Sequence, residues 1–319
     1  MLTFIARRLL ITLPMMLVIS FLVYLGLELT PGDAVSFMID PEAAARMTEE
    51  EFAAMRQALG LDKSFLERYG IWLINVLQGN FGHSLAAGVA ISTIVLDRLP
   101  ATLELALFAL FFSTLFGSVL GTISALRRGS ATDSTLTVFG MMGVSIPEFF
   151  FGLVAILIVA LNLGWLPAGG RLLPGYEGFL DRLPHIVLPG LVMSLMMTAG
   201  VMRYSRSAML DSLSREFIRT AQSKGLPSWR VNLIHGFRVA LTPVVVLLGF
   251  RLPTLIGGSV IIEKVFQWPG IGNEFILAVR GSDYPLVMMI ALMSVLAVLL
   301  ASLIVDVLTA LIDPRVRLT

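Results

Sequence analysis

Charged side chains occur inside several long hydrophobic segments of this chain. Glu104 and Glu148 each lie in a run that is otherwise free of charge, and Arg251 lies near the middle of another run, residues 239–262. An ionisable residue inside a membrane is costly and commonly has a function, such as ion coupling or contact with a polar solute. Arg251, Glu148 and the neighbouring Pro147 are therefore the candidates for a translocation path.

Each charged residue also has a structural interpretation. Glu104 lies one turn into its segment, so a place at the membrane interface or a buried partner is expected. Arg251 has no route to the interface and must face protein or a water-filled path. It would either pair with an acid, Glu148 or one on a partner subunit, or attract an anionic group of a solute.

Enzymatic chemistry finds little support in the residue pattern. No Gly-x-x-x-x-Gly-Lys-Ser/Thr loop occurs, so the chain has no recognisable ATP site of its own. The three histidines, His83, His185 and His235, lie in three separate regions and cannot readily form a metal cluster or a serine–histidine pair. The absence of cysteine excludes disulfides and thiolate metal sites. We predict no catalytic residue, no metal site and no cofactor on this chain.

Composition places the chain in a membrane. Hydrophobic residues make up 56% of it and charged residues only 14%, with a mean hydropathy of +0.87. A helix needs about 20 apolar residues to cross the hydrocarbon core. Six segments approach this length: residues 9–29, 101–126, 136–163, 186–202, 239–262 and 285–312. The expected fold is an all-α polytopic membrane protein with six transmembrane helices, the first an uncleaved anchor.

The distribution of lysine and arginine predicts the orientation. Basic residues gather at the N-terminus, after the second span, after the fourth span and in the tail; they include Arg7, Arg8, Arg127, Arg128, Arg203, Arg206, Arg215, Arg219, Lys224, Arg230, Arg238, Arg315 and Arg317. Residues 30–98, by contrast, hold nine acidic and five basic residues. Both termini are therefore expected in the cytoplasm.

These spans divide the chain into an anchor helix, an external segment, a core and a tail. The boundaries are residues 1–30, 31–98, 99–312 with five spans, and 313–319. In the external segment, Thr48 and Glu51 form a capping box for a helix, and a second amphipathic stretch runs from Phe65 to Leu77. The segment is either a helical cap on the membrane surface or a docking surface for an extracytoplasmic partner, and the two are compatible.

The cytoplasmic loop at residues 203–238 contains an amphipathic pattern. Apolar residues recur every four positions, at Met209, Leu213, Phe217 and Ala221, which predicts one helix over residues 209–222. Gly225 can end it in a left-handed conformation, and Pro227 cannot continue it. A second helix over residues 231–239 would return the chain to the membrane. Composition alone allows either an incidental helix in a basic loop or a docking element for a soluble partner.

Motifs along the whole chain resemble one family, the inner-membrane permeases of dipeptide, oligopeptide and nickel ATP-binding cassette (ABC) importers. They occur at residues 7–10, 30–33, 59–62, 99–106, 145–149, 163–168, 266–272, 283–285, 306–308 and 313–315. Each is weak by itself, but their order and spacing are specific. The resemblance implies a type I ABC importer-like permease bundle.

By this resemblance, the helix around residues 217–223 would insert into a groove on an ATPase subunit. The coupling residues would be Glu216, Phe217, Arg219, Thr220, Ala221, Ser223, Lys224 and Gly225. Expected partners are a second homologous permease, two cytoplasmic ATP-binding subunits that carry ATP and Mg, and an extracytoplasmic substrate-binding protein. Membrane lipid surrounds the chain, and no nucleic acid is implied.

The implied function is import across a bacterial or archaeal cytoplasmic membrane. Peptides are the first expectation for the substrate, with nickel, glutathione and oligosaccharides as alternatives within the family. An ion-coupled secondary transporter that works without an ATPase is the alternative function. Such carriers usually show internal repeats, and no repeat is recognisable in this sequence.

Overall fold

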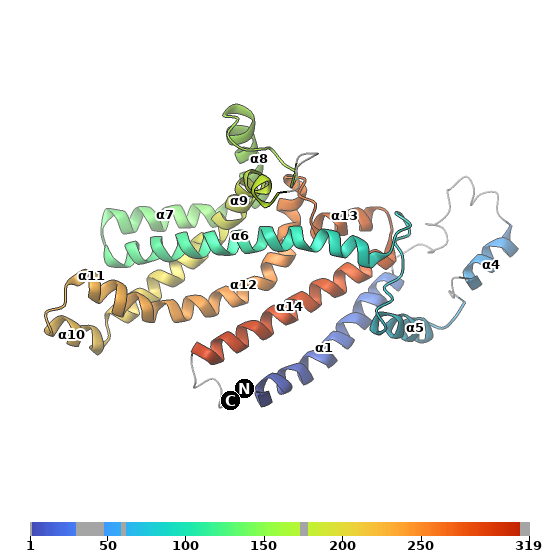
Figure 1. Cartoon of the computed structure of the whole chain (residues 1–319), viewed down its shortest axis with the longest axis horizontal. Coiled ribbons are helices and arrows are strands. Elements are labelled where there is room, and N and C mark those ends of the chain that lie inside the picture. Colours follow the sequence, from blue (N-terminus) through green and yellow to red (C-terminus); the bar gives the residue numbers. More distant parts are fainter. Residues whose placement is uncertain (1, 30–47, 59–61, 173–177, 313–319) are drawn as a thin grey trace. The chain divides into compact units, whose positions relative to one another are not determined.

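The computed structural model describes residues 2–29, 48–58, 62–172 and 178–312, and this part of the chain is helical without a β-strand (Figure 1). Motif residues 30–33, 59–61 and 313–315 lie outside it, as do Arg315 and Arg317 in the tail. The helices are α1 (Leu2–Glu28), α4 (Glu49–Ala58), α5 (Phe65–Leu77), α6 (Ile91–Leu126), α7 (Ala131–Ser145), α8 (Glu148–Ala155), η1 (Ile156–Asn162), α9 (Phe179–Leu213), α10 (Glu216–Ser223), α11 (Ser228–Arg230), η2 (Val231–Phe237), α12 (Arg238–Val265), α13 (Ile271–Arg280) and α14 (Tyr284–Ile312).

Several of these helices are long and apolar enough to cross a membrane. Four satisfy both criteria among the described residues: Ile91–Leu126, Leu180–Leu213, Ser228–Leu247 and Tyr284–Ile304. A bent pair, Ala131–Gly143 and Glu148–Asn162, would add a fifth, and Leu10–Gly26 is a shorter apolar helix. The polytopic helical class is thus confirmed, while the number six stays a prediction.

The third predicted span, residues 136–163, is broken into two helices and is not one continuous helix. The chain breaks between α7 and α8, and the two halves are bent by 99°. Ile146 is extended (φ −94°, ψ 131°) because the ring of the following Pro147 disfavours helical backbone at this position. Pro147 then caps α8, and its missing N–H costs nothing at a helix start. The motif 145–149 therefore forms the sharp bend between α7 and α8.

The described chain divides into two compact units, of which one comprises Ala6–Leu99 and Glu274–Leu296. In this unit α5 packs against α1 through an aromatic cluster of Phe21, Tyr24, Phe65, Tyr69 and Trp72, with ring centroids 5.3–5.9 Å apart. Edge-to-face rings of this kind add stability beyond their buried area. Helix α5 is thus attached to α1, and both helices predicted in the segment 31–98, α4 and α5, are present.

Polar contacts complete this attachment. The Ser20 and Tyr69 hydroxyls are 2.8 Å apart, and Arg68 pairs with Glu28 at the end of α1. Thr48 and Glu51 form the predicted capping box, with the Thr48 N–H donating to Glu51 Oε2 at 2.8 Å. These hydrogen bonds lower the pKa of the Glu51 carboxyl, because they favour its charged form.

Asp283 organises the start of α14 in the same unit. Its carboxylate accepts a hydrogen bond from Ser84 Oγ at 2.5 Å and from the Ala86 N–H at 3.2 Å. Its other oxygen accepts from the Leu286 N–H at 3.3 Å, which caps the helix. The motif 283–285 therefore joins the loop before α6 to the beginning of α14.

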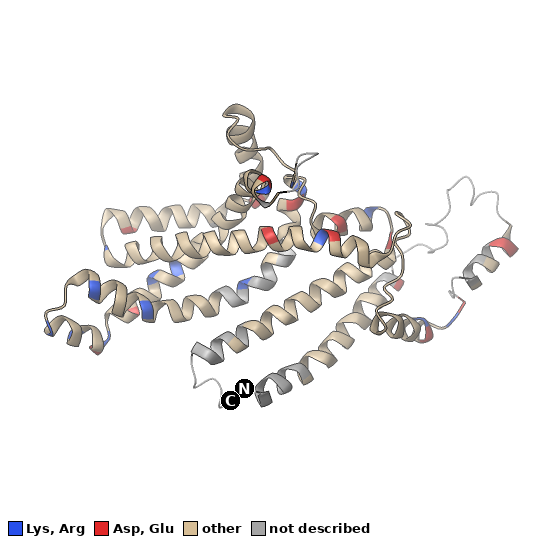
Figure 2. Ribbon diagram, in the orientation of Figure 1, with Lys and Arg blue, Asp and Glu red and all other residues tan. Residues whose placement is uncertain are grey.

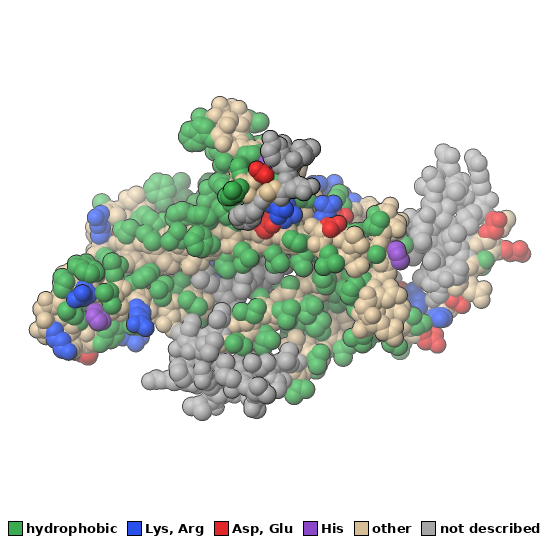
Figure 3. Space-filling model, in the orientation of Figure 1, with side chains coloured by type: hydrophobic (Ala, Val, Ile, Leu, Met, Phe, Trp, Pro, Cys, Tyr) green, Lys and Arg blue, Asp and Glu red, His purple; other side chains and the backbone are tan. Residues whose placement is uncertain are grey.

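The other unit, chiefly Pro100–Asn273, contains a bundle in which α9 packs against α7, α8 and α12. Its core gathers apolar residues of α6, α9, α12 and the turn that follows α12, among them Leu105, Met197, Ile262, Phe266 and Trp268. Along α6 and α7 apolar side chains also face outward, as expected for helices in lipid (Figure 3).

A partly buried ion pair ties three helices of this unit together. Arg206 of α9 donates from Nε and Nη2 to the two carboxylate oxygens of Asp133 in α7, both at 2.8 Å. Asp133 also accepts from Ser124 of α6 at 2.5 Å and from the Gly129 N–H at 2.9 Å. Bidentate pairs of this type fix orientation, so Arg206 is a structural residue of the bundle.

Candidate functional site

The predicted coupling element is a short separate helix, α10, which lies at one end of the bundle with α11 (Figure 1). The predicted continuous helix 209–222 is wrong. Residues 209–213 complete α9, Ser214 and Arg215 form a turn, and α10 begins at Glu216. Ser214 stabilises this break because its hydroxyl donates to the Asp211 carbonyl at 2.8 Å.

The break rotates the apolar face of α10 relative to the four-residue pattern. Ile218 and Ala221 are buried, and they pack with Val231 and with the half-buried Leu213 and Leu226. Phe217, which the pattern placed on the buried face with Ala221, has 38% of its surface exposed. A turn between two helices changes which residues of the second helix face the core, and a four-residue repeat in the sequence does not reveal such a turn.

The C-terminus of α10 has the predicted glycine stop. Gly225 has φ +73° and its N–H donates to the Gln222 carbonyl at 2.9 Å. The Leu226 N–H donates to the Ala221 carbonyl at 3.4 Å, and both side chains belong to the same apolar cluster. These two bonds and this contact define a Schellman motif. Gly225 therefore sets where the chain turns after α10.

The remaining predicted coupling residues form one exposed surface. It consists of Glu216, Phe217, Arg219, Thr220, Ser223 and Lys224 together with Gly225, whereas Ala221 is buried beneath it. Arg219 pairs with Glu216 at 2.9 Å, but both side chains are more than two-thirds exposed, so this pair adds little stability. Basic residues dominate this end of the unit (Figure 2). The α10 surface is thus polar, with charges of both signs around one exposed aromatic ring.

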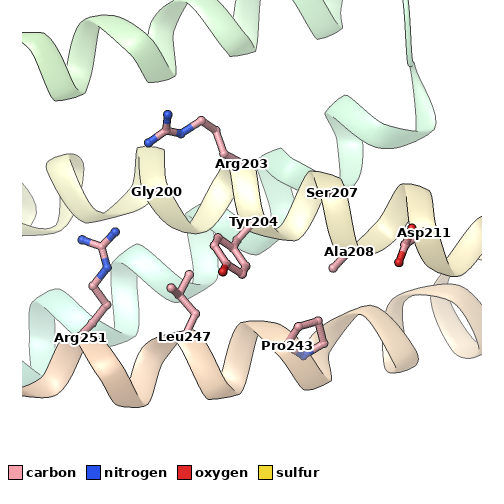
Figure 4. A pocket seen from close by; sticks show the side chains of 9 residues that line it. All are labelled: Gly200, Arg203, Tyr204, Ser207, Ala208, Asp211, Pro243, Leu247 and Arg251. Carbon is pink, nitrogen blue, oxygen red and sulfur yellow. The ribbon is translucent and has the colours of Figure 1, made fainter.

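A pocket of about 580 Å³ lies between α9 and α12 (Figure 4). Its lining comes from two helices only: Gly200, Arg203, Tyr204, Ser207, Ala208 and Asp211 of α9, and Pro243, Leu247 and Arg251 of α12. Arg251, Leu247 and Tyr204 lie between the two ribbons, whereas Arg203 extends from the other side of α9. The volume is in the range of small-molecule sites.

Arg251 reaches α9 because Gly200 has no side chain. A Cβ atom at Gly200 would lie 2.6 Å from Nη2 of Arg251, closer than real Cβ contacts. The guanidinium therefore rests against the backbone of α9 and forms one end of the pocket. Sequence reasoning selected Arg251, but it could not place Gly200 opposite, because the two residues lie on different helices.

The other two path candidates lie elsewhere in the unit. Pro147 and Glu148 form the corner between α7 and α8, and neither occurs among the described residues that line the pocket. Glu148 stands in the first turn of α8, where a negative charge complements the helix dipole. The structure thus separates Glu148 and Pro147 from the pocket that Arg251 lines.

Glu104 has half-buried partners, in place of the interfacial position or buried partner expected of it. Its carboxylate accepts from Arg171 Nε at 2.9 Å and Nη2 at 2.5 Å, and from Arg182 Nη1 at 3.2 Å. All three side chains are at most 29% exposed. Arg171 lies in the loop before α9 and Arg182 in the first turns of α9, so this group joins α6 to both and Glu104 is a structural residue.

Sequence reasoning missed Glu263, which is fully buried. Its Oε1 accepts from the hydroxyls of Thr102 at 2.7 Å and Ser259 at 3.0 Å, and its Oε2 accepts from the Asn273 N–H at 2.8 Å. Nearby, Trp268 Nε1 donates to the Ala101 carbonyl at 2.8 Å. Two sequence motifs, 99–106 and 266–272, meet at this carboxylate, but Glu263 itself lies in neither motif, so no local pattern pointed to it.

The fold defines a polytopic helical membrane protein with a short helix, α10, exposed at one end of its bundle, and comparison with known proteins identifies its family. Residues 117–318 match the binding-protein-dependent transport system inner membrane component, and residues 1–106 match the N-terminal region of the same class of membrane component. The chain therefore belongs to the family of binding-protein-dependent transport system inner membrane components.

Named relatives match over almost the full length. The chain is 37% identical to the oligopeptide transport system permease protein AppB of Bacillus subtilis, covering 99% of this chain and 100% of that protein. It is 37% identical to the di/tripeptide transport system permease protein DppB of Pseudomonas aeruginosa, with 99% of each chain covered. It is 35% identical to the glutathione transport system permease protein GsiC of Salmonella choleraesuis, again with 99% of each covered.

A solved structure supports the fold. The inward-facing MetNI methionine ABC transporter matches with a TM-score of 0.57 and 16% identity, covering 70% of this chain and 97% of that one. The fold is thus that of a type I ABC importer permease. The chain is a transmembrane permease subunit of an ATP-driven ABC importer, a class that works with ATPase and substrate-binding subunits. The comparisons give no support to an ion-coupled secondary transporter.

Proposed function

We propose that this chain lines the path of a peptide importer together with a second, homologous permease. Two cytoplasmic ATPases would bind ATP and Mg, and an extracytoplasmic binding protein would deliver the peptide. Peptide is the preferred substrate because the named relatives include oligopeptide and di/tripeptide permeases. This chain would bind no cofactor and perform no catalysis.

The observation that carries the proposal is the construction of α10. Its buried residues, Ile218 and Ala221, fix it to the bundle, while its outer surface leaves the Phe217 ring 38% exposed among polar and charged side chains. Such a surface suits a soluble partner that moves when it binds ATP. Because α10 follows α9 after only two residues, a displacement of α10 would pass directly into α9 and the pocket it lines.

ATP-driven uptake by the reconstituted complex tests this function. The permease pair, the ATPases and the binding protein are assembled in proteoliposomes with a labelled pentapeptide. Uptake should require ATP on the ATPase side and should persist when an ionophore collapses ion gradients. Uptake by the permease alone, driven by an ion gradient without ATP, would instead support the secondary-transporter alternative.

Phe217→Glu should weaken ATPase docking without unfolding the chain. Phe217 is 38% exposed and lies outside the cluster that holds α10, so a charge there costs little in the isolated permease. At the centre of a docked surface the same charge would be buried without a partner, which lowers affinity by about tenfold or more. Pull-down of the ATPase from detergent measures this. Phe217→Leu, which keeps an apolar contact, is the control, and equal retention of ATPase by both variants would refute the assignment.

The proposed orientation has its own test. Single cysteines replace Thr132 and Arg230 on the expected cytoplasmic side, and Glu50, Gly170 and Ser282 on the expected external side. The native chain has no cysteine, so each label reports one position only. An impermeant thiol reagent added outside intact cells should label only the last three. Reaction of the Arg230→Cys variant from outside would reverse the topology.

A further inference from the structure

The pocket between α9 and α12 has opposite charges at its two ends. Arg251 stands at one end, against Gly200, and Asp211 stands at the other. Gly200 and Asp211 are separated by about three turns of α9, roughly 16 Å at 1.5 Å per residue. Within the described chain, the Asp211 carboxylate takes part in no ion pair. The pocket is therefore an elongated site with a positive end and a negative end.

Between these ends the lining includes one further charged residue, Arg203, whose side chain extends from the other side of α9 (Figure 4). Tyr204, Ala208, Pro243 and Leu247 present apolar surface, and Ser207 adds a hydroxyl. Pocket sites of this kind combine an apolar lining with a few polar groups that fix the orientation of a ligand. A ligand that fits both ends must be long, zwitterionic and tolerant of varied apolar contact along its middle.

We propose that this pocket holds an extended peptide, with its carboxylate toward Arg251 and its α-ammonium toward Asp211. The proposal rests on the proposed function and adds a polarity and a length to it. An extended chain covers about 3.3–3.6 Å per residue, so a span of roughly 16 Å fits about four or five residues. A dipeptide is too short to reach both charged ends.

A phospholipid headgroup is the other common zwitterion at a membrane. Its ammonium and phosphate are joined by only two carbon atoms, so it can engage one end of the pocket but not both. The distance between the two charged groups therefore distinguishes a peptide from a lipid headgroup as the ligand. Changing the lipid composition of the test membrane is a second way to distinguish them.

Capped peptides test the assignment of each end. Binding of fluorescent penta-alanine is measured on the permease–ATPase complex in nanodiscs without the binding protein, so that only the permease selects. Unlabelled competitors are free penta-alanine, its N-acetyl form, its C-terminal amide and free di-alanine. Each cap removes one charged hydrogen bond to the pocket, and di-alanine can form only one of the two. Each of these three competitors should therefore compete about tenfold or more weakly than free penta-alanine.

Substitutions should remove these preferences one at a time. Arg251→Gln should abolish the preference for a free carboxylate but keep that for a free amine, and Asp211→Asn should do the reverse. Gly200→Ala should displace the Arg251 guanidinium while keeping its charge, so it should mimic Arg251→Gln in part. Arg128→Gln, an exposed arginine outside the pocket, is the matched control and should keep both preferences.

The outcomes separate this proposal from the function it rests on. Equal competition by free and capped penta-alanine in the wild-type complex, with ATP-driven uptake intact, overturns the pocket assignment alone. Preferences that change between phosphatidylcholine and phosphatidylethanolamine nanodiscs, rather than with the peptide ends, assign the pocket to lipid and also overturn it. Loss of ATP-driven uptake in the wild type overturns the proposed function.

Discussion

Gly225→Val is expected to abolish ATP-driven transport while the chain remains in the membrane. Gly225 has φ +73°, a conformation in which a β-branched residue is strained by about 1–3 kcal/mol. The strain falls on the Schellman motif that ends α10, so the turn to α11 must change. The helix would then present its exposed surface to the ATPase at a wrong angle, while the spans are untouched.

Gly129→Val is the matched control for this prediction. Gly129 has φ +78° in the turn between α6 and α7, and a Cβ there, as at Gly225, meets nothing within 4 Å. Both substitutions thus impose similar backbone strain at sites of similar space. ATPase pull-down and peptide uptake should fall by at least about tenfold for Gly225→Val and remain near wild type for Gly129→Val. Equal losses in the two variants would show that general strain, and not docking, is the cause.

Local signals in the sequence predicted the elements of this fold well. The capping box at Thr48 and Glu51 and the stop at Gly225 each depend on a few adjacent residues, and both are present in the structure. Hydrophobic length located the spans, because a helix in lipid satisfies its own backbone. What failed was the assumption of continuity: the corner at Pro147 and the turn at Ser214 each interrupt a helix without interrupting the apolar pattern.

The candidate sites could be predicted from the sequence only in part. The α10 surface could be predicted because a short run of adjacent residues contains it. The pocket could not, since Arg251 meets Gly200, and shares a pocket with Asp211, only when α12 packs on α9. Glu263 is the strongest example, because its partner Thr102 is far from it in sequence and Asn273 lies beyond the end of its helix. A charge among apolar residues predicts that some partner exists, but it does not name the partner.

Glu263→Ala is expected to destabilise the bundle more than removal of any exposed charge. Glu263 is fully buried and accepts hydrogen bonds from two hydroxyls and one N–H. Its removal leaves these buried donors unsatisfied, at about 1–3 kcal/mol each, and opens a cavity beside them. The segment 266–272 is shaped around this carboxyl: a Cβ at Gly270 would overlap it, and one at Gly272 would lie 3.0 Å from Oε2.

Thermal unfolding of the purified permease in detergent measures the effect. Glu263→Ala should lower the free energy of unfolding by roughly 3 kcal/mol or more. Glu263→Gln keeps the shape and one carbonyl oxygen for the two hydroxyls, but it sets an NH2 group against the Asn273 N–H, so an intermediate loss is expected. Glu274→Ala is the control, because Glu274 pairs at 3.2 Å with the exposed Arg98, and such pairs contribute about 1 kcal/mol or less. If Glu263→Ala and Glu274→Ala lower the unfolding temperature equally, the Glu263 carboxylate does not hold the α6, α12 and α13 segments together.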